Sequence, residues 1–336
     1  MPDIRLATFN CENLMMRCDF RRAGIRNARQ QLTDVDSPLV AEQVDTAFDV
    51  LSEDDRTLTA RALAATGAEV CALQEVENLV TLTAFDRRYI AEWTGSPFDQ
   101  RVLHEGNDSR GIDVALLSRL PVSFQRSHAR KTFGRLGVRP PVGLTVNDYA
   151  FRRDCLEVDV VKDGRVLTLF VCHFKSMHGG RRKTRAVRQA EAAAVRRVVS
   201  LRFEAPEAAD WVILGDFNDY CEVDGQRVSD CGLGPLLDDG FAVDLAPRAI
   251  ADPLDRWTHH FTEEDTYGAL DHMLVSPRLA AQNPAAGMEV IRAGSPYHAA
   301  RYTGFRYPGI GWFEPKASDH CPLVASIKFE GQALNP

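Results

Sequence analysis

Short apolar runs with the length of β-strands recur along the whole chain, and several alternate with polar residues. A period of two residues is typical of a half-buried strand, because successive side chains of a strand point to opposite faces. We therefore predict strands at Ile4–Phe9, Val70–Leu73, Ile112–Leu117, Leu156–Val161, Val166–Cys172, Val212–Leu214, Met273–Val275 and Leu323–Ile327.

Helical periodicity lies between these runs. The spacing of apolar residues predicts a helix at Leu58–Thr66 and, more clearly, a second helix from about Thr184 to Leu201. Residues 187, 190, 194 and 198 of that second segment are apolar and fall on one face of a helix. Strands and helices mixed in this way predict an α/β fold built of layers.

The rest of the chain contains no repeat or obvious linker, so we expect one domain over residues 1–330 and a C-terminal tail at 331–336. An acidic stretch at about 19–55 is predicted to be an insertion. The segment from Ala293 to Pro315, rich in glycine, proline and aromatic residues, is predicted to be a loop. Long loops inside a domain often carry function.

Composition excludes some classes of protein. The 336 residues are 45% hydrophobic with a net charge of −7, so any contact with a polyanion must come from a local basic patch. No run approaches the roughly 18 apolar residues that span a bilayer, and the start MPDIRLATFN does not resemble a secretory signal. Four cysteines, Cys71, Cys155, Cys172 and Cys321, lie in apolar runs and no CxxC pair occurs. We therefore expect reduced thiols and a cytoplasmic protein.

Clusters of acidic, amide and imidazole side chains stand at the ends of the predicted strands. They occur in TFNCENL (8–14), LQEVEN (73–78), HFKS (173–176), GDFND (215–219), LDH (270–272) and SDHCP (318–322). Strand ends that meet at one edge of a sheet would gather these side chains in one cleft. Oxygen donors of this kind suit Mg²⁺, Mn²⁺ or Ca²⁺. Hydrolysis of a phosphate ester needs such a cation together with groups that orient water and stabilise the leaving oxygen.

These motifs, with RGIDVALLSR (110–119), LDHMLVS (270–276) and SDHCPL (318–323), resemble the endonuclease/exonuclease/phosphatase superfamily. The resemblance runs from about Ile4 to Ile327, with the motifs in the family's order. It implies a two-sheet α/β sandwich of the DNase I type, with the active site at one end of the sheets. It also implies metal-dependent hydrolysis of phosphodiesters.

Roles carry over from the family by position. The resemblance implies metal binding by Asn10, Glu12, Glu75, Asp216 and Asp319. It implies catalytic roles for His173, Asp216, Asn218, Asp271 and His320, with Asp271 orienting the imidazole of His320. Phosphate contacts are expected from Asn10, Arg110, Arg153, Lys175 and Asn218. Glu12 stands where some members have aspartate, so its contact with a metal is expected to run through water.

Structural interpretations compete with these roles. An isolated Asn10 or Asn218 would be a turn former, and Arg110, Arg153 or Lys175 would be an ordinary surface cation. Glu77 and Asp219 are interpreted as solvated or capping acids and His272 as a packing residue, and His259 and His260 receive no role.

The second predicted helix carries arginines opposite its apolar face, at 181, 182, 185, 188 and 196. A solvated helix face explains them. Because the helix begins beside the HFKS motif, a track for a polyanion is the alternative hypothesis.

The sequence indicates the substrate less directly than it indicates the fold. No GxSxG, Walker A or dinucleotide-binding fingerprint occurs, and Leu270-Asp271-His272-Met273 differs from the motif of inositol phosphatases. A nuclease acting on DNA or RNA is the leading prediction. A phosphodiesterase for a smaller substrate, such as a sphingomyelinase-like enzyme, and a catalytically silent binding module of the same fold remain as alternatives.

Overall fold

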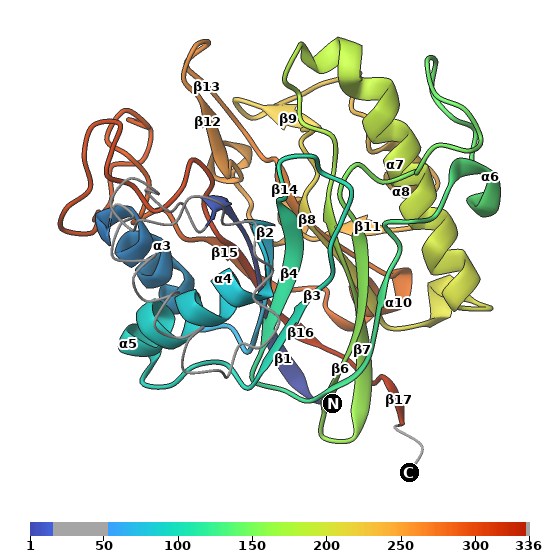
Figure 1. Ribbon diagram of the computed structural model, residues 1–336, viewed down its shortest axis with the longest axis horizontal. Helices are drawn as coiled ribbons and strands as arrows, with labels where there is room; N and C mark the ends of the chain where they lie inside the picture. The colour runs from blue at the N-terminus through green and yellow to red at the C-terminus, as the bar shows by residue number, and fades with distance from the viewer. Residues whose placement is uncertain (16–52, 334–336) are drawn as a thin grey trace, which may run out of the picture.

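The computed structural model describes residues 1–15 and 53–333. Its centre is a pair of β-sheets packed face to face, with helices on both outer faces (Figure 1). This architecture confirms the predicted two-sheet α/β sandwich. Among the described residues, no helix combines the length and the hydrophobicity needed to cross a membrane.

The first sheet has six strands in the order β15-β16-β1-β2-β4-β3. Only β1 and β2 run parallel; the other neighbours are antiparallel. The strands are β1 (Asp3–Leu14), β2 (Val70–Val76), β3 (Gln100–Leu103), β4 (Asp113–Ser118), β15 (Gly287–Val290) and β16 (Leu323–Lys328).

The second sheet follows the order β11-β14-β8-β7-β6-β5, with β17 paired to β7. Here β7 and β8 are the parallel pair. Its strands are β5 (Val122–Ser127), β6 (Cys155–Lys162), β7 (Arg165–His173), β8 (Trp211–Asp216), β11 (Val243–Asp244), β14 (Asp271–Val275) and β17 (Gln332–Ala333). A small third sheet consists of β9 (Glu222–Val223), β10 (Gln226–Arg227), β12 (His259–Phe261) and β13 (Thr266–Gly268).

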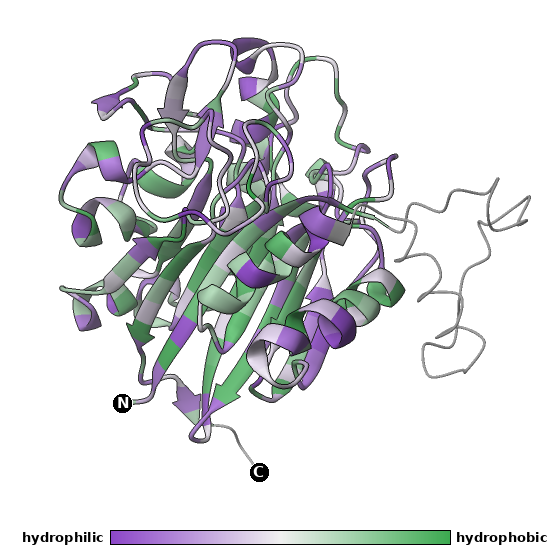
Figure 2. Ribbon diagram, turned by 90° about the vertical axis from the view of Figure 1, so that its left-hand side faces the viewer, coloured by the Kyte–Doolittle hydropathy of each residue, from purple (hydrophilic) through white to green (hydrophobic). Residues whose placement is uncertain are grey.

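Helices cover the outer face of each large sheet. Beside the first sheet lie α3 (Glu53–Ala65), α4 (Leu79–Phe85), a π-helical turn (Asp86–Ile90) and α5 (Ala91–Thr94). Beside the second lie α6 (Phe133–Leu136), α7 (Arg181–Arg202) and α8 (Gly234–Leu237). The remaining helical segments are α9 (Ala246–Ala249), α10 (Pro277–Gln282) and 3₁₀ turns at Pro206–Ala208 and Pro253–Asp255. Figure 2 shows hydrophobic residues along the central strands and hydrophilic residues in the surrounding helices and loops.

Every strand and helix predicted above forms, usually with wider bounds. The predicted strand Ile4–Phe9, for example, extends to Leu14, and the second helix begins at Arg181. The segment from Ala293 to Pro315 contains no helix or strand, as predicted. The predicted insertion at 19–55 lies outside the described residues except for its last three positions, which begin α3.

The period of two residues positions the polar side chains at the end of the sandwich. In β8, Val212 and Leu214 belong to the core between the two sheets, so Asp216 is the next residue on that inner face. By the same count His173 ends the inner face of β7, and Asn10 lies on that of β1. Inward-facing positions toward the ends of β1, β7 and β8 are therefore polar, and they meet between the two sheets.

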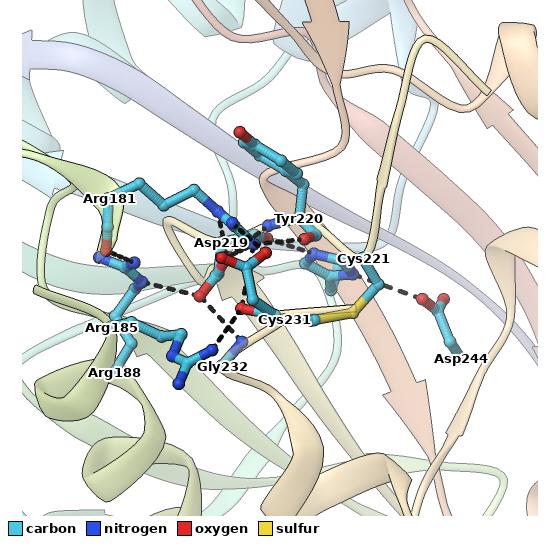
Figure 3. Close-up of a disulfide and its surroundings, with 11 residues drawn as sticks. Arg181, Arg185, Arg188, Asp219, Tyr220, Cys221, Cys231, Gly232 and Asp244 are labelled. Carbon is cyan, nitrogen blue, oxygen red and sulfur yellow. Dashed lines mark hydrogen bonds and ion pairs between the residues drawn. A yellow bond between two sulfur atoms is a disulfide. The ribbon is translucent and has the colours of Figure 1, made fainter. Parts of the chain in front are cut away.

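The cysteines correct one expectation. Cys221 and Cys231 form a disulfide, although reduced thiols were predicted (Figure 3). Both lie outside the strand-like runs, and the turn through β9 and β10 brings their Cα atoms to 5.0 Å. The other described cysteines are buried and free, at positions 11, 71, 155, 172 and 321. Disulfides are rare in the cytosol, so the expected cytoplasmic location loses the support that uniformly reduced cysteines would have given it.

Candidate active site

Asp216 is the centre of the polar cluster between the sheets. Its Oδ2 accepts hydrogen bonds from Nδ2 of Asn10 and of Asn218, both at 3.0 Å, and its Oδ1 accepts one from the Asn218 backbone at 2.7 Å. Two imidazoles face the same carboxylate, with Nε2 of His173 at 3.4 Å and Nε2 of His320 at 3.8 Å from Oδ2. The structure thus brings five of the predicted residues into one group.

The electrostatics of Asp216 follow from its position. Burial raises the pKa of its carboxyl to about 7, against the opposing effects of His320 and of the amide donors. A carboxyl group with a pKa in this range can accept a proton from water and return it near neutral pH.

His320 is held by Asp271, far away in sequence. Nδ1 of the imidazole lies 2.7 Å from Asp271 Oδ2, and Asp271 pairs with Asp216 in the register of β14 and β8. Burial lowers the pKa of His320, but the carboxylates of Asp271, Asp216 and Asp319 outweigh it and hold that pKa well above its usual value. His320 is therefore an imidazolium at neutral pH.

His173, unlike His320, is neutral. Burial, together with the positive charges of Arg153, His320 and Arg110, lowers the pKa of this imidazole well below its usual value. Its Nδ1 is buried without a hydrogen-bond partner among the described residues. The cluster therefore contains one cationic and one neutral histidine, both facing the same carboxylate.

Glu75 departs from the alternation of its strand. Counting along β2 would put it on the outer face, but its φ of +63° lies in the left-handed region and redirects the chain. Its Oε2 accepts a hydrogen bond from the Asn13 backbone at 3.0 Å, and its Oε1 lies 3.9 Å from Nε2 of His173. Glu12, Asn13 and Asn218 also have positive φ. Such conformations cost about 1–3 kcal/mol each for residues other than glycine and gather at functional sites.

Glu12 is engaged by other groups. Its Oε1 pairs with Lys316 Nζ at 2.8 Å, and its Oε2 accepts from the Asp319 backbone at 2.9 Å. Burial, followed by the charge of Asp319, raises the pKa of Glu12 to about 7. The side chain thus joins the end of β1 to the segment before β16.

Two of the candidate phosphate-binding cations, Arg153 and Arg110, lie close enough to His173 to lower its pKa. Arg153 is buried, contacts Asp108 Oδ2 through Nε at 2.7 Å and donates to the Phe174 carbonyl at 2.8 Å. Arg110 shares the same carboxylate at 3.1 Å, but its side chain is 52% exposed. Lys175 is half-buried and donates from Nζ to the Ser176 carbonyl at 3.0 Å. Arg110 is therefore the arginine that a ligand can reach from solvent.

Two groups of donors among the described residues are close enough to share a cation. They are Asp216 with Asp271 and His320, and His259 with Asp319 and His320. A protonated His320 has no lone pair for a metal, so the carboxylates and His259 are the donors that remain. In addition, Asp271 Oδ1 is buried without a hydrogen-bond partner among the described residues, and Glu75 Oε1 lies 3.9 Å from His173 Nε2. Carboxylate oxygens are the donors that a hard divalent ion prefers, so the residues fit such an ion.

His259 was missed by the sequence analysis. A β-bridge pairs it with His320, and the centroids of the two rings lie 4.8 Å apart. Nothing in the local sequence separates His259 from His260, which follows it on the other face of β12. Only the pairing with a residue 61 positions later brings it to the site.

Asp219 and the arginines of α7 also differ from expectation. Asp219 is fully buried and accepts hydrogen bonds from Arg181 at 2.9 Å, Arg188 at 3.0 Å and the Gly232 backbone at 3.0 Å (Figure 3). Arg188 is itself 0% exposed. The hypothesis of a polyanion track is therefore wrong for Arg181 and Arg188, because their guanidinium groups bind the loop that follows Asn218.

We expect Arg188→Gln to destabilise the fold by about 3 kcal/mol, because removing one partner of a buried ion pair leaves the other uncompensated. The matched control is Arg182→Gln on the same helix, whose side chain is 93% exposed. Its effect should stay within about 0.5 kcal/mol. Urea denaturation of both variants measures the difference, and equal stability would contradict the structural role of Arg188.

Comparisons with known proteins agree with this geometry. Residues 7–320 match the model of the Endonuclease/Exonuclease/phosphatase family, a span that contains every predicted site residue. No curated protein sequence matches the chain.

Solved structures share the fold at low sequence identity. An endonuclease/exonuclease/phosphatase from Bacteroides vulgatus is 15% identical with a TM-score of 0.55, covering 98% of this chain and 100% of that one. D. rerio TDP2 complexed with a single-strand DNA product is 15% identical with a TM-score of 0.54, covering 97% and 99%. SmcL is 13% identical with a TM-score of 0.54, covering 97% and 99%. With the family match over nearly the whole chain, the conclusion is that the protein belongs to the endonuclease/exonuclease/phosphatase family.

Proposed function

We propose that the protein is a divalent-cation-dependent phosphodiesterase that cleaves nucleic acid. The observation that carries the proposal is the environment of Asp216. This buried carboxylate is surrounded by two asparagine amides, one cationic histidine and one neutral histidine. A hydrolase needs such a set, since one group must accept a proton from water while others stabilise the phosphoryl oxygens.

Substrate phosphate is bound by cationic and neutral donors. The imidazolium of His320 offers Nε2–H, and the neutral His173 offers one hydrogen bond without adding charge. The exposed guanidinium of Arg110 reaches the same region, and the geometry of its fork suits a phosphate. Arg153 adds positive charge beside His173, and Lys175 interacts with the charges of Arg153 and Arg110.

Water is activated by Asp216 and oriented by Asn218. As the water oxygen forms its bond to phosphorus, Asp216 takes one proton from the water. The bond from phosphorus to the leaving oxygen breaks, and that oxygen takes a proton from the imidazolium of His320. Asn10 and Asn218 hold the carboxylate in place through its Oδ2. A divalent cation held by Glu75, with Asn10 and Asp319 as further donors, would supply charge that neutralises the substrate phosphate.

Two observations favour nucleic acid as the substrate, one from a protein of similar structure and one from this chain. The similar D. rerio TDP2 is described in complex with a single-strand DNA product. In this chain, aromatic residues of the 293–315 segment are exposed, among them Tyr297, Phe305, Trp312 and Phe313. Aromatic rings near a phosphate site are suited to stacking with unpaired bases.

The test is a panel of plasmid DNA, single-stranded DNA, RNA and bis-p-nitrophenyl phosphate, each with Mg²⁺, Mn²⁺ or Ca²⁺. We expect an oligonucleotide to be cleaved with a kcat/KM at least tenfold above that for the small diester, and chelation to stop both reactions. Cleavage of the small diester alone would indicate a phosphodiesterase for small substrates. Binding of nucleic acid without hydrolysis of any substrate would indicate a binding module.

A further inference from the structure

A cavity of about 420 Å³ opens beside the candidate active site. We call it the aromatic pocket, and its walls include Trp257, His260, Phe261 and His298. Two of these residues come from β12, which with β13 projects beyond the ends of the large sheets (Figure 1). The volume of the aromatic pocket lies within the range of about 300–1,000 Å³ that is usual for binding sites of small molecules.

The aromatic pocket is continuous with the catalytic cluster. His259 and Asp319 also line it, and both lie close enough to His320 to share a ligand with it. A phosphate bound by His320 would therefore place the group attached to it at the entrance of this pocket.

The rings of the aromatic pocket are held in fixed positions. His260 stacks on Tyr267 with ring centroids 4.3 Å apart, and its Nε2 contacts Asp265 Oδ1 at 2.9 Å. Its Nδ1 lies 3.0 Å from Nδ1 of His298, which in turn packs against Phe313 at 4.9 Å. The rings are therefore arranged before a ligand arrives, which reduces the entropy cost of stacking.

The charge of the aromatic pocket argues against a second phosphate. Among the described residues that line it, Lys316 is the one lysine or arginine, and its Nζ is bound by Glu12 at 2.8 Å and Glu314 at 3.2 Å. Glu263 and Glu264 add negative charge near the exposed rim. Burial and the nearby His260 and Lys316 lower the pKa of His298, so this ring is neutral at pH 7.

A neutral, flat group with polar edges matches these walls. Aromatic rings offer stacking, and a neutral imidazole offers either a donor or an acceptor according to its tautomer. The second ring nitrogen of His298 has no hydrogen-bond partner among the described residues, so it is available to a ligand.

We propose that the aromatic pocket binds the base of the nucleotide adjoining the scissile phosphate. This inference rests on the proposed nuclease function and specifies the substrate further, since it requires an unstacked base next to the cleaved bond. Bases in a duplex are stacked, so single-stranded substrates or strand ends would be preferred.

The experiment uses single-stranded oligonucleotides in which one base is removed at successive positions, leaving the sugar and phosphate intact. For the wild-type protein we expect kcat/KM to fall roughly tenfold to a hundredfold when the missing base adjoins the cleaved bond. Removal of bases farther away should change it little.

His298→Ala provides the second arm. It should cut kcat/KM for the intact oligonucleotide by a similar factor, yet cleave the oligonucleotide lacking the adjoining base at the wild-type rate. Phe313→Ala, which removes the ring behind His298, should give a smaller loss of the same kind. The control is Tyr149→Ala, an aromatic residue that is 41% exposed and lies outside the pocket lining, which should behave as wild type.

The outcomes separate the two proposals. If oligonucleotides are cleaved but base removal has no positional effect, or if His298→Ala slows both substrates equally, the pocket does not bind a base. If no oligonucleotide is cleaved while bis-p-nitrophenyl phosphate is, the nuclease function itself is wrong and the base pocket is rejected with it.

Discussion

Replacement of Glu75 by glutamine is expected to lower turnover by about a hundredfold or more and to abolish tight binding of the divalent cation. The substitution preserves shape, and the remaining side-chain oxygen can still accept the hydrogen bond from the Asn13 backbone. What it removes is the negative charge beside His173; Arg110 interacts with this charge, but its guanidinium pairs with Asp108. A metal contributes several kcal/mol of charge stabilisation to phosphoryl transfer, and each 1.4 kcal/mol corresponds to about a tenfold change in rate.

The matched control is Glu77→Gln, two residues along the same chain segment. Glu77 accepts a hydrogen bond from the Thr81 hydroxyl, so its carboxylate contacts the start of α4. Titration calorimetry with Mg²⁺ and Mn²⁺ and turnover at saturating metal should separate the two variants. Full activity of the wild-type protein in excess chelator, with no metal bound, would reject the metal-dependent mechanism.

The inner-face residues of the site were predictable because the alternation of inward and outward side chains along each strand extends to them. The period of two that buries Val212 and Leu214 also carries Asp216 inward, and the same holds for His173 after Val171. Sequence motifs at the strand ends and burial by alternation thus indicate the same residues. The resemblance to a family added the long-range partner, since no local pattern joins Asp271 to His320.

Glu75 marks where that alternation fails. Alternation along β2 places it on the outer face, yet its left-handed φ brings the carboxylate to His173. A positive φ on a residue other than glycine has no sequence signature. The strand-end cluster LQEVEN and the family resemblance indicated this residue, and only the structure gives the reason that it reaches the site.

The prediction for the polar face of helix α7 was wrong for a different reason. Its apolar face was predicted correctly, but the opposite face was assigned to solvent by default. Asp219 and the disulfide-linked segment from Cys221 to Cys231 cover the start of that face and bury Arg188. The partner lies 31 residues away in the chain, so helical periodicity contains no information about it.

His320 and Asp271 are expected to act as a unit, and His320→Ala should lower turnover by roughly 10²–10⁴-fold, the usual contribution of a positioned acid–base group. Because the pKa of His320 is held well above its usual value by the surrounding carboxylates, the group lost is a cation that faces Asp216 and the substrate phosphate. Asp271→Asn should cost less. An amide can still accept the hydrogen bond from Nδ1 at the 2.7 Å position, but it no longer stabilises the imidazolium by its charge.

A double-mutant cycle at saturating metal tests this coupling. Once His320 is absent, Asp271 has no imidazole to orient, so adding Asp271→Asn to His320→Ala should reduce turnover little further. The pH dependence gives an independent readout: Asp271→Asn should lower the pKa of His320, so that activity declines at a lower pH than in the wild-type protein. Losses that multiply fully in the double mutant, with an unchanged pH profile, would show that the two residues act separately. Another group would then have to hold the imidazole, and His259, whose ring centroid lies 4.8 Å from that of His320, is the neighbour to replace next.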